Sequence, residues 1–213
     1  MIRLAARRTP ALDGLGLSVL GLVLLVLLAT PPVRRWAHDS HLVWLYLVGV
    51  AFAASFCAVP IVRGYAIWRG VLDQPSPRKL QKVSIPLLGG VAVYFAFAVT
   101  VLFNFNFSRE LKGVALGATA IVVLGVLDDL LELPAAIKLG GHVAAAGIAM
   151  AWDVTLNVAP NWLPGFVWIN MLLTFLWFVT VTNAVQFLDG MDGLAAGLGV
   201  VAGVFFSITA IQT

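Results

Sequence analysis

Seven segments of this chain are apolar over roughly the length that a membrane-spanning helix needs. A helix requires about 20 mainly apolar residues to cross the hydrocarbon core of a bilayer. The chain is 61% hydrophobic and has a mean hydropathy of +1.00, far above the values of ordinary soluble domains. The sequence therefore predicts an all-α integral membrane protein with about seven transmembrane helices.

The expected helices lie between glycine, proline and charged residues. They cover residues 12–29, 42–62, 85–103, 114–127, 134–152, 166–184 and 194–211. Pro60 is expected to kink or end the second helix, and Pro134 to open the fifth. The chain is interpreted as one polytopic domain over residues 1–213, with two leading helices in 1–62 and a motif-bearing region in 63–213.

Basic residues in the loops predict the orientation of the chain in the membrane. A cytoplasmic N-terminus places Arg3, Arg7, Arg8, Arg63, Arg69, Arg78, Lys79, Lys82 and Lys138 inside, and Arg34, Arg35, Arg109 and Lys112 outside. This excess of basic residues inside favours that orientation. It brings the loop 63–84 and the acidic turns at 128–129 and 189–192 to the cytoplasmic face.

Two acidic pairs, Asp128 with Asp129 and Asp189 with Asp192, each follow an apolar segment. Carboxylates beside a hydrocarbon-length helix are costly, so they indicate a functional site, although an Asp-Gly turn between two helices is the alternative. Carboxylate oxygens suit Mg²⁺ or Mn²⁺ that bridge substrate phosphates, and the basic loop 63–84 would neutralise the remaining phosphate charge. The pattern predicts phosphoryl-transfer chemistry on a polyanionic substrate.

Other classes of site find less support in the sequence. Cys57 is the single cysteine, lies in an apolar segment and is expected to pack there. His38, Asp39 and His41 are close in sequence, but a surface role is favoured over a metal site. A transporter is disfavoured because the acidic residues gather at one face and no paired broken helices occur.

Three segments, in this order, resemble the leading signatures of the polyprenyl-phosphate N-acetylhexosamine-1-phosphate transferases (glycosyltransferase family 4). They are DQPSPRKLQKVSIPLLGG at 73–90, GVLDDLLELPAAIKLGGH at 125–142 and NAVQFLDGMDGLAAG at 183–197. The resemblance implies transfer of N-acetylhexosamine 1-phosphate from a UDP-sugar to polyprenyl (undecaprenyl) phosphate with release of UMP. That reaction initiates lipid-linked synthesis of bacterial cell-wall or surface polysaccharides. The SIPLLGG wording favours N-acetylglucosamine as the sugar.

The resemblance assigns catalysis to Asp128 and Asp129, which with Asp192 are also the implied ligands of Mg²⁺, Mn²⁺ being the alternative ion. The residues implied to bind substrate are Arg78, Lys79, Lys138, Asn183, Asp189 and Asp192. The implied partners are a UDP-N-acetylhexosamine, a polyprenyl phosphate and the membrane, with no nucleic acid, and a homodimer is compatible with the resemblance. The expected location is the bacterial inner membrane, as a multi-pass protein whose active face is cytoplasmic.

The chain departs from the family pattern at Gln81, His142 and Gln186, where histidine, glutamine and asparagine respectively are usual. These polar replacements leave the roles of the three positions open. Family members continue through further helices that carry a Gly-Asp motif and a His-rich loop. The chain is therefore expected to be the N-terminal part of a longer transferase. The alternative is a noncatalytic membrane scaffold or binding protein of the same ancestry.

Overall fold

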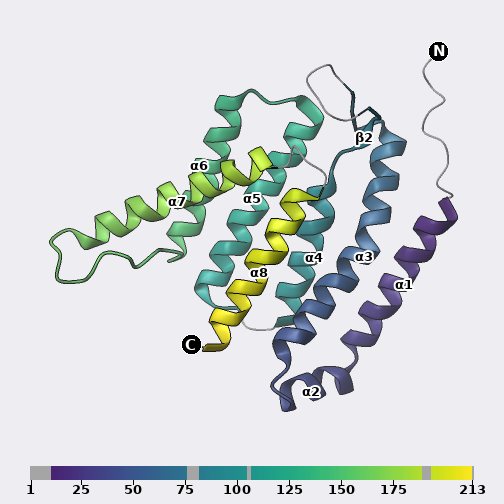
Figure 1. Ribbon diagram of the computed structural model, residues 1–213, viewed down its shortest axis with the longest axis horizontal. Helices are drawn as coiled ribbons and strands as arrows, with labels where there is room; N and C mark the ends of the chain where they lie inside the picture. Colours follow the sequence, from purple (N-terminus) through teal and green to yellow (C-terminus); the bar gives the residue numbers. More distant parts are fainter. Residues whose placement is uncertain (1–10, 76–81, 105–106, 189–192, 213) are drawn as a thin grey trace.

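A computed structural model describes residues 11–75, 82–104, 107–188 and 193–212. Its elements, in chain order, are α1 (Ala11–Ala29), α2 (Pro31–Asp39), α3 (Val43–Arg69), β1 (Leu72–Asp73), β2 (Ile85–Pro86), α4 (Gly89–Asn104), α5 (Arg109–Leu131), α6 (Ala135–Ala151), α7 (Phe166–Leu188) and α8 (Leu194–Gln212). The two strands pair antiparallel, with Leu72 opposite Pro86 and Asp73 opposite Ile85. The all-α prediction is confirmed, with this short hairpin as the addition (Figure 1).

The long helices match the seven expected segments, but several ends differ. Pro60 lies inside α3 and does not end it, because the helix continues to Arg69 and stops only at Gly70. Gly70 adopts a left-handed φ of 72° that glycine tolerates at a helix C-terminus. Ile85 was expected to open the third helix but lies in β2, so α4 begins at Gly89.

Helix α5 begins earlier than expected and contains the acidic pair within its last turn. Its N-terminus is capped by Ser108, whose Oγ accepts a hydrogen bond from the Leu111 N–H at 3.1 Å. Such a cap satisfies one of the N–H groups that a helix start leaves without a partner. The cap explains why the helix extends back to Arg109, a charged residue that hydropathy alone would place in a loop.

Helix α2 was not expected from the sequence. It bends by 63° from α1, and Thr30 lies at the break. Pro31 and Pro32 occupy the first helical turn, where a missing N–H costs nothing. Ala37 of α2 is buried against Tyr46 and Val50 of α3, so this short helix packs onto the bundle.

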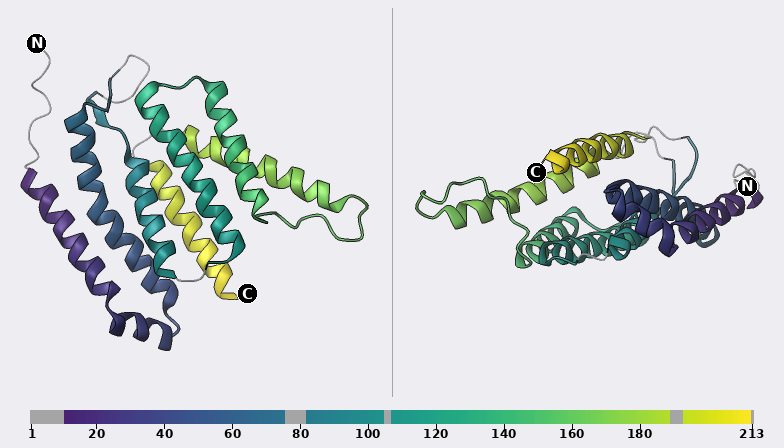
Figure 2. Two further views of the ribbon diagram at one scale, coloured as in Figure 1. Left: turned by 180° about the vertical axis from the view of Figure 1, so that it is seen from behind. Right: turned by 90° about the horizontal axis from the view of Figure 1, so that it is seen from below.

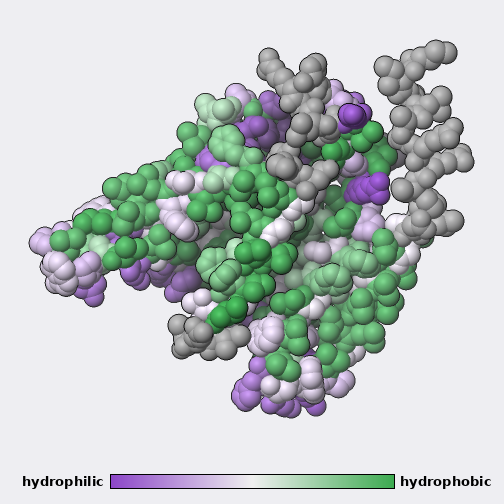
Figure 3. All heavy atoms as spheres, viewed as in Figure 1, coloured by the Kyte–Doolittle hydropathy of each residue, from purple (hydrophilic) through white to green (hydrophobic). Residues whose placement is uncertain are grey.

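Three of the described helices, α3, α5 and α7, are each long and apolar enough to cross a membrane, and the bent α1–α2 pair would make a fourth span. Helices α4, α6 and α8 are apolar but shorter. On the face in Figure 3, hydrophilic residues gather near the top and over α2 at the bottom, with a mainly hydrophobic surface between. The chain is a multi-pass membrane protein; the seven spans and the cytoplasmic N-terminus stay predictions.

The helices form two layers (Figure 2). Helices α1, α3, α4, α5 and α6 lie side by side in one layer, and α7 and α8 lie on one side of it. Close contacts within the first layer depend on small residues. A Cβ on Gly21 of α1 would lie 2.5 Å from the Cys57 N of α3, and one on Gly113 of α5 would lie 2.5 Å from the Trp152 Cβ. The Cys57 backbone thus lies at a tight helix crossing, and its side chain is partly buried there.

Candidate active site

The C-terminal end of α5 concentrates negative charge. Asp128 and Asp129 lie in its last turn, where the helix dipole already disfavours carboxylates. The helix ends at Glu132, which adopts a left-handed φ of 50° and donates its N–H to the Asp128 backbone oxygen at 2.8 Å. Carboxylates at a helix C-terminus need hydrogen-bond donors or cations to compensate their charge, and the neighbouring segments of the chain supply both.

The Asp128 carboxylate has a partner on each oxygen. Its Oδ1 accepts a hydrogen bond from the Leu133 N–H at 3.0 Å, and its Oδ2 lies 2.8 Å from the Lys138 Nζ. Lys138 reaches Asp128 from the first turn of α6, which begins directly after Pro134. The Lys138 and Asp128 side chains are 29% and 23% exposed, so water screens this pair less than a surface ion pair. The structure thus joins two of the predicted site residues.

The Asp129 carboxylate contacts a different part of the chain. Its Oδ2 accepts a hydrogen bond from the Leu88 N–H at 2.9 Å, across 41 residues of sequence. Leu88 is buried and has a φ of 69°, a conformation that is unfavourable for a residue with a Cβ. The strained backbone turns the chain from the hairpin into α4 and aims this N–H at α5.

Further contacts join the two strands of the β1–β2 hairpin to each other. The Leu87 N–H donates to the Val71 oxygen at 3.2 Å, and the Ser84 Oγ donates to the Gln74 Oε1 at 3.0 Å. In Figure 1 the hairpin lies at the same end of the molecule as the α5–α6 connection. The first motif segment and the second are therefore neighbours in space.

A cavity of about 430 Å³ lies between the hairpin and the α5–α6 connection. Its lining residues are Leu72, Asp73, Gln74, Leu87, Asp128, Asp129, Glu132, Leu133 and Lys138. Sequence reasoning did not select Asp73, Gln74 or Glu132. Asp73 is the first residue of the first motif segment, and Glu132 follows Asp128 by four residues, one helical turn. These positions could have identified both residues as site candidates. The cavity combines acidic groups with one lysine.

The remaining residues that the sequence singled out fall into two groups, those outside the described part of the chain and those that the structure places elsewhere. Arg78, Lys79, Gln81, Asp189 and Asp192 lie outside the described residues. The Asn183 Nδ2 of α7 donates a hydrogen bond to the Val179 backbone oxygen of its own helix at 2.7 Å. Asn183 is not among the residues that line the cavity. Gln186 of α7 is exposed.

His142 of α6 is buried at 8% exposure. Within the described part of the chain, no hydrogen-bond partner reaches its Nδ1. The imidazole lies one helical turn beyond Lys138, but the cavity lining does not include it. The role of His142 therefore stays open.

The donor atoms around the cavity suit a hard divalent cation. Carboxylates of Asp73, Asp129 and Glu132 and the Gln74 side-chain oxygen offer only oxygen ligands, which Mg²⁺ and Mn²⁺ prefer. No three His, Cys, Asp or Glu side chains among the described residues are grouped closely enough to hold an ion by themselves. Mg²⁺ commonly takes one or two carboxylates and completes its shell with water and substrate phosphate. The residues present fit that mode.

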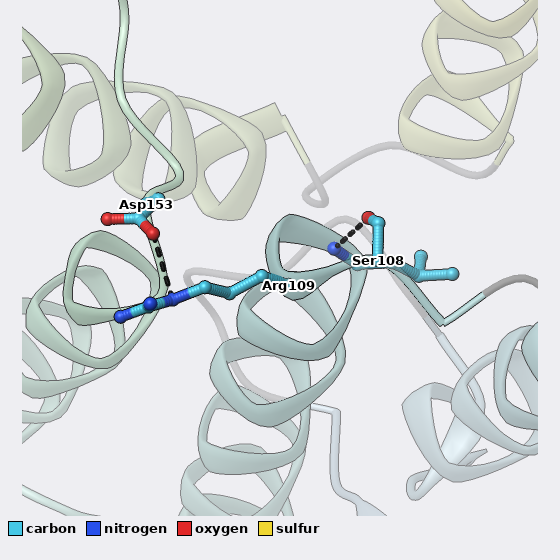
Figure 4. A network of polar contacts seen from close by, with 4 residues as sticks. Ser108, Arg109 and Asp153 are labelled. Atoms are coloured by element: carbon cyan, nitrogen blue, oxygen red, sulfur yellow. Dashed lines mark hydrogen bonds and ion pairs between the residues drawn. The ribbon is translucent and has the colours of Figure 1, made fainter.

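The opposite end of the α5–α6 pair has a second ion pair (Figure 4). The Arg109 Nε lies 2.8 Å from the Asp153 Oδ2, next to the Ser108 cap. The side chains are 65% and 62% exposed, and Asp153 follows the end of α6 with a φ of 66°. This contact connects the two helices without forming part of the cavity.

Comparison with known proteins adds independent information. The model of glycosyl transferase family 4 matches residues 111–213. The chain is 35% identical over 163 residues to a probable undecaprenyl-phosphate N-acetylglucosaminyl 1-phosphate transferase of Bacillus subtilis, covering 71% of this chain and 45% of that relative. It is 30% identical over 183 residues to a decaprenyl-phosphate N-acetylglucosaminephosphotransferase of Mycolicibacterium smegmatis, covering 78% and 45%.

The chain thus spans about half the length of the curated relatives that it matches. No solved structure is significantly similar to it.

Proposed function

Because the chain belongs to glycosyl transferase family 4, the polyprenyl-phosphate N-acetylhexosamine-1-phosphate transferases, we propose that it transfers N-acetylglucosamine 1-phosphate from a UDP-sugar to a polyprenyl phosphate. An oxygen of the lipid phosphate forms a bond to the β-phosphorus of the donor. The bond from that phosphorus to the bridging oxygen breaks, and UMP leaves with the electron pair. The names of the relatives support the acceptor and the sugar.

The observation that carries this proposal is the cavity at the end of α5, where Lys138, Asp128 and Asp129 are held by defined contacts. Two anions must meet in the reaction, so positive charge has to offset their repulsion. We assign this role to the Lys138 ammonium. The Asp128 carboxylate holds it in position, and the Leu133 N–H in turn orients that carboxylate by donating to its Oδ1. Asp128 is then a positioning residue.

We assign the contact with the acceptor phosphate to Asp129. Its carboxylate lines the same cavity, and the Leu88 N–H fixes the orientation of one of its oxygens. From there it can orient the lipid phosphate and accept its proton before attack. An end-of-helix site in a multi-pass protein suits both substrates, because the lipid phosphate reaches it from the bilayer and the donor from the water.

A bound Mg²⁺, or Mn²⁺, would offset the charge of the donor pyrophosphate. By resemblance its protein ligands would be Asp128, Asp129 and Asp192. Since each Asp128 oxygen already has a protein partner, we assign the ion to Asp129 and Asp192, with Asp73 and Glu132 of the cavity as further oxygen ligands. Arg78, Lys79, Asn183, Asp189 and Asp192 keep their expected substrate-binding roles within this proposal. The inner-membrane location, the cytoplasmic active face and a homodimer are also parts of the proposal.

The test is to supply membranes containing this chain with UDP-N-acetylglucosamine, undecaprenyl phosphate and Mg²⁺, and to measure UMP and the lipid-linked sugar. We expect the two products in equal amounts, and their rate of formation to fall by at least about 100-fold with Asp129→Asn. Membranes without the chain provide the blank. Binding of undecaprenyl phosphate without product formation would reject the transferase proposal and favour the noncatalytic membrane protein.

A further inference from the structure

The far end of the molecule from the acidic cavity carries a second polar feature, formed by α2. Figure 1 places α2 at the bottom of the bundle and the β1–β2 hairpin at the top. The sequence of α2, PPVRRWAHD, contains two arginines, a histidine and an aspartate in nine residues. Such a segment is too polar for the hydrocarbon core, although it follows the apolar α1 directly.

Two apolar side chains of α2 pack against the bundle, and most of its polar side chains are exposed. Ala37 is buried and Val33 packs against the cluster that Ala37 forms with Tyr46 and Val50. Arg35 and His38 are exposed on the other side, and Trp36 is 57% exposed. Tryptophan at such a position is typical of the membrane–water boundary. Together with the 63° bend from α1, this distribution is that of a helix lying at the membrane surface.

A cavity of about 410 Å³ opens along α2. Its lining residues are Ala29, Pro31, Arg34, Arg35, His38 and Asp39. Two guanidinium groups beside one carboxylate make the lining cationic overall. Arginine binds phosphate oxygens through paired N–H groups, so a phosphate group suits this lining.

From these observations we propose that α2 is an interfacial helix whose Arg34 and Arg35 bind the head-group phosphate of an anionic phospholipid in the surrounding bilayer. The hydrophobic surface of α1 beside the cavity would contact the acyl chains of the same lipid. The proposal names a lipid site separate from the acidic cavity, and it holds in either orientation of the chain. It does not depend on the proposed transferase activity.

The test is native mass spectrometry of the detergent-solubilised chain, titrated with dioleoylphosphatidylglycerol or with dioleoylphosphatidylcholine. We expect the anionic lipid to bind in preference. We expect Arg34→Gln with Arg35→Gln to weaken its binding about 25-fold, about fivefold for each arginine lost near an anionic head group. The matched control, Arg109→Gln with Lys112→Gln, removes two exposed cations outside the cavity. It should change the affinity by about twofold or less.

Three results would overturn the proposal: equal losses in the two double variants, equal binding of the two lipids, or displacement of the bound lipid by excess inorganic phosphate. The last result would identify a soluble phosphate as the ligand. If the Arg34 and Arg35 double variant does not fold, the exposed Arg35→Gln variant alone should still weaken binding about fivefold, and unchanged affinity would reject the site.

Discussion

The α5–α6 pair is joined at its two ends by ion pairs of the same length, 2.8 Å, in different surroundings. Asp128 and Lys138 are mostly sheltered, line a cavity and share it with further acidic groups. Arg109 and Asp153 are more than 60% exposed. Exposed pairs are worth about 0 to 1 kcal/mol, because water and salt screen them. The two ion pairs thus have the same length but differ in burial. We expect only the sheltered pair, Asp128 with Lys138, to take part in the proposed reaction.

The largest expected effect comes from Asp129→Asn. Loss of a general base typically lowers turnover by about 10² to 10⁴-fold, so we expect a drop of at least about 100-fold. The matched control is Asp153→Asn at the other end, which should leave turnover within about twofold. Initial rates of UMP release in membranes, normalised to the amount of folded protein, measure both. Equal rates for wild type and Asp129→Asn would remove Asp129 from the reaction.

Substitution of Lys138 should affect both activity and stability. Lys138→Gln removes the cation from Asp128, and loss of a hydrogen-bonded charge partner costs about 2 kcal/mol of stability. We expect Lys138→Arg to restore most of the stability because it keeps the charge. Thermal unfolding in detergent, compared with Arg109→Gln, gives the measurement. A larger loss of stability from Arg109→Gln than from Lys138→Gln would contradict the expectation that the sheltered ion pair stabilises the protein more than the exposed one.

A third substitution, Gly113→Ala, tests how close helix packing contributes to stability independently of the two ion pairs. Gly113→Ala would place a Cβ 2.5 Å from the Trp152 Cβ, near the exposed end of the α5–α6 pair. Overpacking of this kind costs about 1 to 3 kcal/mol. Gly125→Ala in the same helix is the control, because its Cβ would meet nothing within 4 Å. Unfolding midpoints should fall for Gly113→Ala only, and equal midpoints would contradict the close crossing.

The smallest effect concerns the exposed pair. Asp153→Asn should lower stability by less than about 1 kcal/mol, and about 1 M salt should abolish the difference because screening already weakens the pair. Unfolding measured at low and high salt tests this expectation. A loss that persists at high salt would show that this end is held by more than an exposed ion pair.

Hydropathy was sufficient to predict the seven apolar helices, because each apolar run is long and most of the runs begin or end near a proline, glycine or charged residue. The motifs singled out Asp128, Asp129 and Lys138, which the structure brings to one cavity, and their roles stay predictions. The contact between Leu88 and Asp129 could not be predicted from the sequence. It joins residues 41 positions apart, and it depends on a left-handed backbone conformation at Leu88 that no local sequence preference indicates. Helix α2 was missed for another reason: a short polar segment with two prolines looks like a loop until Ala37 finds its packing partners.

The most direct test of the account is a pair of double-mutant cycles on UMP release, one with Asp128→Asn and Lys138→Gln, the other with Arg109→Gln and Asp153→Asn. If Asp128 acts by holding Lys138, each single variant of the first cycle should be nearly as slow as the double variant. The second cycle should stay close to the wild-type rate throughout. Independent, multiplying losses in the first cycle, or equal losses in the two cycles, would contradict the account.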